Sequence, residues 1–151
     1  GDVYKRQDYS RWYATADTYP QNAVRGPIVM VTNQWAGSDG DIVAAATQAM
    51  GYAKVIGERS WGGVVGIDGR FDLVDGTSVT QPRYAGWYGS YGWGVENHGV
   101  DPDIVVTVSP EDWEADCDVQ LDAAIAECLR QLDDKPAATA PELPGPAFDR
   151  C

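Results

Sequence analysis

A largely apolar run, a glycine-rich turn and a helical pattern follow one another directly in this chain, and this succession constrains its fold most. Residues 27–33 are rich in β-branched side chains and predict a strand covered on both faces. After the turn at residues 36–40, apolar residues recur at helical spacing, at positions 42, 43, 46, 49 and 50. Gly51 is a typical helix stop, and residues 54–57 indicate a second strand. Strand, helix and strand at these intervals predict a βαβ unit with parallel strands, and hence an α/β fold.

The next two segments predict a β-hairpin and a loop. Residues 70–74 and 77–81 flank Asp75-Gly76, a dipeptide favoured in two-residue hairpin turns. Residues 84–94, YAGWYGSYGWG, are rich in glycine and aromatic side chains and follow neither the helical nor the strand period. We therefore interpret them as a loop whose rings pack locally or line a cleft.

The last third of the chain predicts one more strand, one more helix and a tail. Residues 104–108 are rich in β-branched side chains, which indicates a strand. Apolar residues recur on one face of a helix over 119–133, and Asp118 is placed to cap its first turn. Residues 135–151 are rich in proline and alanine and have no period, so we expect a disordered tail or linker there.

The length of 151 residues is that of one domain. The first seven residues, GDVYKRQ, resemble the translation of a sequencing adapter rather than native protein. On this interpretation the native sequence begins at Asp8 and the true N-terminus is missing. A native polar tail at residues 1–7 is the alternative that stays open.

The formal net charge of −12 argues against nucleic acid and anionic membranes as partners, because both would repel an acidic protein. No apolar run has the length of a membrane span. The acidic residues are scattered and lack the spacing of metal ligands. We therefore expect neither a metal nor an organic cofactor.

The three cysteines, Cys117, Cys128 and Cys151, form no CxxC pattern, and an odd number is a poor basis for a set of disulfides. On one continuous helix Cys117 and Cys128 would lie about 16 Å apart, which is too far for a disulfide. We expect reduced thiols, and for that reason a cytoplasmic location.

Ser38 stands at the junction between the first strand and the first helix, where two interpretations meet. A serine at such a junction is commonly a helix N-cap. Gly37 and Gly40 bracket it, however, and allow a sharp turn and the close approach of another molecule. The free N–H groups of the first helical turn, at Asp39 and Gly40, could stabilise an oxyanion formed when the hydroxyl attacks a carbonyl. The local pattern supports a cap and a nucleophile alike.

A serine nucleophile needs a base, and the sequence offers few. His98 is the single histidine, and a lone loop histidine is more often structural than catalytic. A lysine can serve instead, as in Ser-Lys hydrolases. Outside the first seven residues the lysines are Lys54 and Lys135, and neither stands in a glycine-bounded loop. The residues alone therefore identify no base.

Four quoted runs carry a resemblance to a known family, in the same order and at compatible intervals: TYPQNAVRGPIVMVTNQWAGSDGDI, IGERSWGGVVGI, DGTSVTQP and GWGVENHGVDPDI. Over residues 18–132 the chain resembles the C-terminal catalytic core of the tail-specific protease family of serine peptidases, in its tricorn-like branch. The resemblance implies a crotonase-like α/β core, with residues 8–134 forming the C-terminal half of a catalytic domain.

The resemblance also implies roles for three residues. Ser38 would be the nucleophile, the backbone N–H of Asp39 would contribute to the oxyanion hole, and Glu96 would be the carboxylate of a Ser-His-Ser-Glu tetrad. The histidine, the second serine and the glycine that completes the oxyanion hole lie upstream of the nucleophile in the family, in a part of the chain not present here. The fragment would then hold half of the catalytic machinery.

Two glycines separate the branches of the family and suggest where substrate lies. Gly63 occupies the place of the lysine of the Ser-Lys branch, which excludes the lysine-base variant and favours the tricorn-like branch. Gly62 and Gly63 are expected to border the peptide cleft, where glycine lets a substrate backbone approach; a simple tight turn is the alternative. Near the position of the family's aspartate that selects basic residues this chain has Asp8, but Tyr9 stands at the aligned position, so the sequence supports no claim of a preference for basic residues.

The hypothesis is a serine endopeptidase that hydrolyses peptide bonds of oligopeptides or unfolded chains through an acyl-enzyme on Ser38. The resemblance further implies peptide substrates and a homo-oligomer in the full-length protein, and the isolated fragment is expected to be inactive. A non-catalytic peptide-binding or scaffold domain that keeps the protease fold is the alternative. A histidine motif and a partner serine upstream of Asp8 would distinguish the two.

Overall fold

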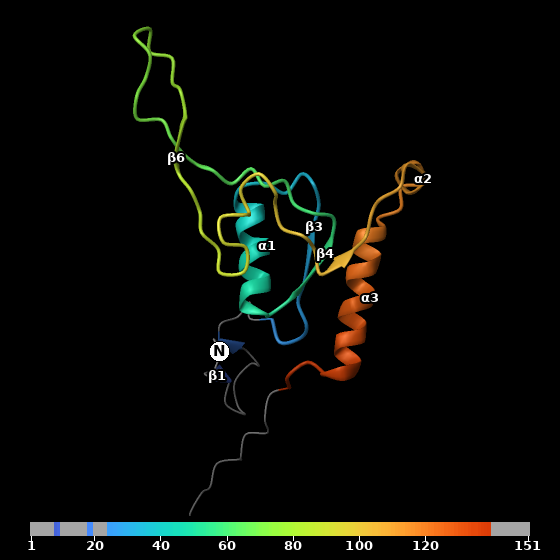
Figure 1. Ribbon diagram of the computed structural model, residues 1–151. Helices are drawn as coiled ribbons and strands as arrows, with labels where there is room; N and C mark the ends of the chain where they lie inside the picture. Colours follow the sequence, from blue (N-terminus) through green and yellow to red (C-terminus); the bar gives the residue numbers. More distant parts are fainter. Residues whose placement is uncertain (1–7, 10–17, 20–23, 140–151) are drawn as a thin grey trace, which may run out of the picture. The chain divides into compact units, whose positions relative to one another are not determined.

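The computed structural model describes residues 8–9, 18–19 and 24–139. The chain forms two compact units, one of residues 28–130 and one of the two flanking segments. The larger unit holds Ser38, the Ser60–Gly63 segment and Glu96, whereas the first quoted motif run begins in the flanking unit. The main strands, helices and hairpin of the larger unit are shown in Figure 1.

The flanking unit contains one short strand pair among its described residues. β1 (Asp8–Tyr9) pairs antiparallel with β2 (Thr18–Tyr19). Residues 135–139 form neither helix nor strand. The interpretation of residues 1–7, and that of the tail from residue 140 onward, concern residues outside the described part of the chain.

The predicted βαβ unit is confirmed. β3 (Val29–Thr32), α1 (Asp39–Met50) and β4 (Lys54–Gly57) follow in order, and the two strands pair in parallel with Met30 beside Val55. β7 (Ile104–Val105) adds a third parallel strand to β4. The sheet order is therefore β3-β4-β7, and the fold is α/β with a parallel sheet.

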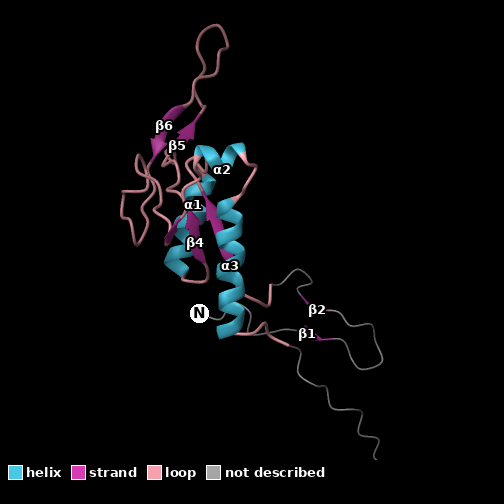
Figure 2. Cartoon of the chain, turned by 90° about the vertical axis from the view of Figure 1, so that its right-hand side faces the viewer, coloured by secondary structure: helices cyan, strands magenta, loops and turns pink. Residues whose placement is uncertain are grey.

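The core of the larger unit lies where α1 packs on β3 and β4 (Figure 2). Met30 of the sheet contacts a cluster of buried small and β-branched side chains, namely Ala44, Ala45, Val64, Val95 and Val100. Two of these come from α1 and three from the loops that follow β4 and β6. The same packing that holds α1 therefore fixes the loops around its N-terminal half.

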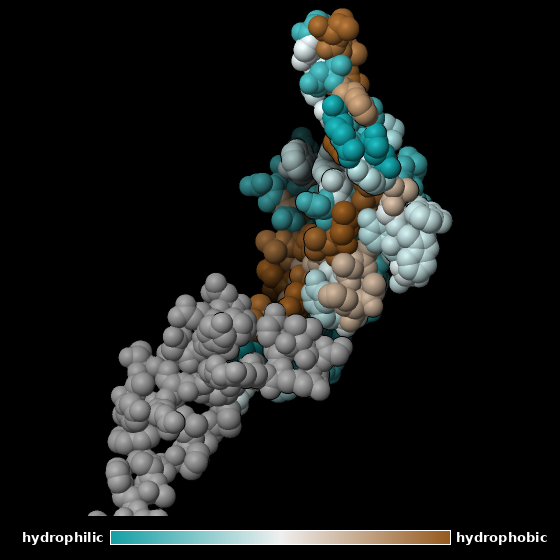
Figure 3. Space-filling view, turned by 90° about the vertical axis from the view of Figure 1, so that its left-hand side faces the viewer, coloured by the Kyte–Doolittle hydropathy of each residue, from teal (hydrophilic) through white to brown (hydrophobic). Residues whose placement is uncertain are grey.

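The expectation that residues 27–33 form a strand covered on both faces is wrong for the described part of the chain. Side chains alternate between faces along a strand, so Met30 contacts the core while Val31 lies on the opposite face. Val31 is 42% exposed there. Apolar residues also gather on the surface in the middle of the side shown in Figure 3.

A hairpin forms, as predicted, but its strands and its turn differ from those predicted at residues 70–74 and 77–81. β5 (Gly66–Asp68) pairs antiparallel with β6 (Gln81–Tyr84), and the predicted runs between them contribute an isolated bridge from Asp72 to Ser78. The turn hydrogen bond joins Gly76 N–H to the carbonyl of Leu73 (2.9 Å), and Gly76 has φ 81°. Gly76 thus follows the turn in the left-handed region instead of sharing a two-residue turn with Asp75.

Three further predictions concern the segments from residue 85 to the last helix. The aromatic loop is confirmed from residue 85 on, with Tyr88 and Tyr91 packed against the core. The last strand is shorter than the predicted 104–108. The helix predicted over 119–133 is α3 (Val119–Asp134), and Asp118 Oδ1 accepts a hydrogen bond from Leu121 N–H at 2.9 Å as a cap. A short helix, α2 (Pro110–Glu114), was not predicted.

Cys117 and Cys128 have free thiols, as expected. Cys117 precedes α3, so the one-helix spacing used to separate it from Cys128 does not apply. Cys151 lies outside the described residues. Within those residues no helix is both long and apolar enough to cross a membrane.

Candidate active site

Ser38 occupies the N-cap position of α1 without acting as a cap. Its backbone has φ 56° and ψ −113°, and its side chain makes no capping hydrogen bond. A non-glycine residue with positive φ is uncommon, and such strain is concentrated at functional sites. Of the two interpretations of Ser38, the structure removes the hydrogen-bonded cap and leaves a hydroxyl at a strained strand-to-helix turn.

The first turn of α1 places the Asp39 N–H next to Ser38, without a hydrogen bond to the described residues. Gly40 N–H donates to the carbonyl of Gly37 at 2.9 Å, so it is occupied. This corrects the expectation that both Asp39 and Gly40 present free donors. Asp39 N–H makes no hydrogen bond within the described part of the chain. Such a donor at the N-terminus of a twelve-residue helix favours a negative charge nearby.

The segment Ser60–Gly63 lies against the turn that carries Ser38. Trp61 N–H donates to the carbonyl of Ala36 at 2.9 Å. A side chain at either Gly37 or Gly63 would collide with the indole ring of Trp61. The ring is nevertheless 68% exposed. A side chain at position 37 or 63 would therefore force this ring beside Ser38 to move.

Asp41, in the first turn of α1, binds the Ser60–Gly63 segment through buried hydrogen bonds. Its side chain has no exposed surface, and Oδ1 accepts hydrogen bonds from Gly62 N–H (2.8 Å) and from the Ser60 hydroxyl. Asp41 was not among the site residues predicted from the sequence. An acidic residue one helical turn after a nucleophile candidate was the available signal, but a first-turn acid is also the ordinary complement of a helix dipole.

Glu96 lies in a turn that is bound to the same glycine. Asn97 N–H donates to the carbonyl of Gly62 at 2.9 Å. Gly62 has φ 81°, and a Cβ there would lie 2.5 Å from the backbone nitrogen of Gly99. Glu96 itself is half-buried, and no hydrogen bond joins its carboxylate to Ser38 in the described part of the chain. The structure thus brings the Glu96 turn and the Ser60–Gly63 segment together without a direct link between the two predicted catalytic side chains.

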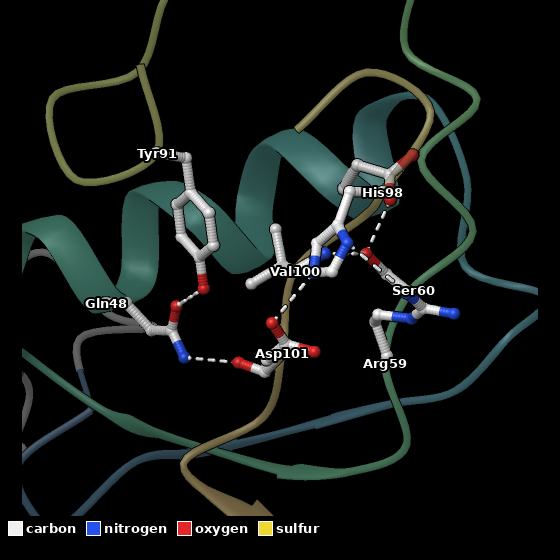
Figure 4. Close-up of polar contacts among 8 residues, drawn as sticks. Gln48, Arg59, Ser60, Tyr91, His98, Val100 and Asp101 are labelled. Atoms are coloured by element: carbon white, nitrogen blue, oxygen red, sulfur yellow. Dashed lines mark hydrogen bonds and ion pairs between the residues drawn. The ribbon is translucent and has the colours of Figure 1, made fainter. Parts of the chain in front are cut away.

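His98 is engaged at both ring nitrogens. Arg59 Nη1 lies 3.3 Å from Nδ1, and Asp101 Oδ2 lies 2.9 Å from Nε2, as Figure 4 shows. Since arginine only donates, Nδ1 is the acceptor and Nε2 carries the proton toward Asp101. The side chain is about half exposed. This arrangement supports a structural role for His98 rather than that of base for Ser38.

Lys54 is also poorly placed to act as the base. Ser38 follows the C-terminal end of β3, whereas Lys54 begins the parallel strand β4 and so stands at the opposite edge of the sheet. Its ammonium lies 3.9 Å from Asp103 Oδ1. No group of three or more potential metal ligands occurs within the described residues. The candidate site therefore consists of Ser38, the Asp39 amide, the Ser60–Gly63 segment and the Glu96 turn.

Comparison with known proteins identifies the family to which this geometry belongs. Residues 2–106 match the model of Peptidase family S41. The chain belongs to peptidase family S41. It is 59% identical over 127 residues to tricorn protease homolog 1 of Streptomyces coelicolor, and 48% identical over 118 residues to the tricorn protease of Thermoplasma acidophilum. The resemblance drawn from the quoted motifs is confirmed.

The S41 chain spans a small part of these relatives. The matches cover 84% and 78% of this chain but 12% and 11% of the two relatives. The crystal structure of the tricorn protease aligns with it at a TM-score of 0.79 and 45% identity, over 87% of this chain and 13% of that one. The α/β fold with a parallel sheet is therefore similar to that of the tricorn protease.

Proposed function

We propose that this chain carries the nucleophile of a tricorn-like serine endopeptidase, Ser38, and that the base histidine belongs to an upstream segment. The backbone of Ser38 supports the proposal most: φ is 56° and the hydroxyl is not used as a cap. A strained strand-to-helix turn that exposes a serine hydroxyl is how nucleophilic serines are presented in other hydrolases. Membership of an S41 peptidase family and similarity to tricorn proteases agree with it.

In the proposed reaction the Ser38 oxygen attacks the scissile carbonyl while the upstream histidine takes the hydroxyl proton. The Asp39 N–H would stabilise the oxyanion, since it makes no hydrogen bond to the described residues and lies at a helix N-terminus. The C–N bond then breaks, the amine leaves with that proton, and water hydrolyses the acyl-enzyme. Glu96 would orient the histidine through the second upstream serine, and Gly62 and Gly63 would border the peptide.

The proposal includes the wider setting of the site. Residues 8–134 would form the C-terminal half of a crotonase-like catalytic domain, with residues 135–151 as a tail. The substrates would be oligopeptides or unfolded chains, and the full-length protein would be a cytoplasmic homo-oligomer. These statements extend the family assignment by resemblance to the tricorn-like branch.

Fluorophosphonate labelling and peptide hydrolysis test the proposal in the full-length protein. We expect the wild type to be labelled and Ser38→Ala to lose both labelling and turnover. Ser109→Ala is the matched control, because Ser109 caps α2 and should leave labelling unchanged. Labelling that persists in Ser38→Ala would remove Ser38 from this role.

The isolated chain tests the division of the site. We expect negligible peptide turnover from the 151 residues alone, because the base would be absent. Robust hydrolysis by the isolated chain would contradict the upstream location of the histidine. Peptide binding by a full-length protein that is never labelled would instead favour the non-catalytic scaffold.

A further inference from the structure

Asp41 is a buried acidic side chain that the proposed chemistry does not use. It has no exposed surface, and Oδ2 has no hydrogen-bond partner within the described residues. Burying a charged group costs free energy unless it is paired, and buried polar groups without partners are rare. An apolar residue would fill this position without that cost. The role of this carboxylate therefore lies in the groups that bind its other oxygen, Oδ1.

The bonded oxygen of Asp41 joins three segments that are distant in sequence. Oδ1 accepts from the hydroxyl of Ser60 and from the N–H of Gly62 (2.8 Å). The Ser60 oxygen in turn accepts from the N–H of Val100 at 2.8 Å, and Figure 4 shows Ser60 beside Val100. The first turn of α1, the Ser60–Gly63 segment and the stretch after the Glu96 turn thus meet at one buried junction.

The junction fixes the position of Gly62, whose backbone is held by two hydrogen bonds. Its N–H is held by Asp41, and its carbonyl accepts from Asn97, the residue after Glu96. Asp41 is three residues after Ser38 on the same helix. A shift of the Asp41 carboxylate would therefore move Gly62 and the Glu96 turn relative to Ser38.

We propose that Asp41 is a positioning residue of the peptidase site, one that fixes the Ser60–Gly63 segment and the Glu96 turn relative to Ser38. This inference rests on the proposed peptidase function. Asp41 touches no reacting atom; it acts through Gly62 and Ser60. Small displacements of this kind lower turnover steeply, by roughly 100-fold for about 1 Å.

The test compares Asp41→Ala with Asp41→Asn in the full-length protein. We expect kcat/KM for a peptide, expressed per labelled site, to fall roughly 100-fold in Asp41→Ala. Asp41→Asn should stay within about tenfold of the wild type, because its amide oxygen still accepts from Ser60 and Gly62. The saturating extent of fluorophosphonate labelling counts sites with a reactive Ser38.

Val43→Gly is a matched control in the same helix. Val43 is 48% exposed and belongs neither to the junction nor to the buried cluster, so its replacement should lower the melting temperature and leave kcat/KM per labelled site unchanged. Ser60→Ala provides a second route if Asp41→Ala does not fold. It removes the links from Asp41 to Ser60 and from Ser60 to Val100 but keeps that to Gly62, and should lower kcat/KM about tenfold.

The outcomes separate the two proposals. A wild type that is never labelled, or labelling that persists in Ser38→Ala, defeats the peptidase proposal and says nothing in favour of the junction. With a labelled wild type, the inference is overturned if Asp41→Ala, or Ser60→Ala in its place, retains wild-type kcat/KM per labelled site. It is also overturned if Asp41→Asn is as impaired as Asp41→Ala, since the hydrogen bonds would then not matter.

Discussion

At the scale of single residues, Gly51 and Gly62 both have a positive φ but differ in what surrounds them. Gly51 has φ 64° at the end of α1 with open space around it, whereas Gly62 has φ 81° and lies against the backbone of residues 98–99. Alanine at position 51 should therefore cost only the left-handed backbone penalty, about 1–2 kcal/mol of unfolding free energy, and leave peptide hydrolysis intact. Denaturant unfolding and kcat/KM, both in the full-length protein, measure the two effects.

Alanine at position 62 adds a collision to the same backbone penalty. Its Cβ would lie 2.5 Å from Gly99 N, so the segment must move away from the Glu96 turn. We expect kcat/KM to fall by roughly 100-fold or more, as for other displacements of a site. Equal activity of Gly62→Ala and Gly51→Ala would show that the position of this segment is irrelevant to function.

At the scale of elements, the N-terminus of α3 tests the capping that the sequence indicated. Asp118 Oδ1 accepts from Leu121 N–H at 2.9 Å. Removing the acceptor in Asp118→Ala should weaken the first turn by about 1 kcal/mol, whereas Asp118→Asn should be nearly neutral because asparagine is an equally good cap. Hydrogen exchange at the Leu121 amide should quicken about fivefold in the alanine variant. An unchanged exchange rate would mean that the cap contributes nothing.

Elements determined by a pattern within their own segment could be predicted from the sequence. Features that depend on contacts between residues distant in sequence could not. The βαβ unit and α3 follow from periods and caps that lie within each segment. The hairpin strands were predicted at the wrong residues because their pairing is not local. Gly66 pairs with the distant Tyr84, and the turn between the strands is of the type that Gly76 follows in the left-handed region. Asp41 was missed for the same reason: its partners Ser60 and Gly62 lie 19 and 21 residues away.

At the scale of the larger unit, Tyr91 joins several segments by hydrogen bonds, and together with Tyr88 it should make the unit less stable at alkaline pH. Tyr91 donates to Gln48 Oε1 (2.7 Å), and Gln48 Nε2 donates to the carbonyl of Asp101 (2.8 Å), which links the aromatic loop, α1 and the segment before β7 (Figure 4). Burial raises the pKa of the Tyr91 phenol, and the carboxylate of Asp101 raises it further. Burial likewise raises the pKa of Tyr88, with the charge of Asp41 adding to it.

The direction of both shifts fixes the sign of the pH dependence. A phenol whose pKa is higher in the folded state holds its proton more tightly there, so stability is fully present below the unfolded pKa of about 10 and falls as pH rises through the folded value. We expect the unfolding midpoint to decrease above about pH 10, and Tyr91→Phe and Tyr88→Phe each to flatten that decrease. Trp87→Phe, at an exposed ring of the same loop that carries no phenol, is the control and should leave the slope unchanged. If neither Tyr91→Phe nor Tyr88→Phe changes how the unfolding midpoint falls with pH, the two phenols ionise as easily in the folded protein as in the unfolded chain. That result would contradict the prediction, because both tyrosines are partly buried against the core at α1.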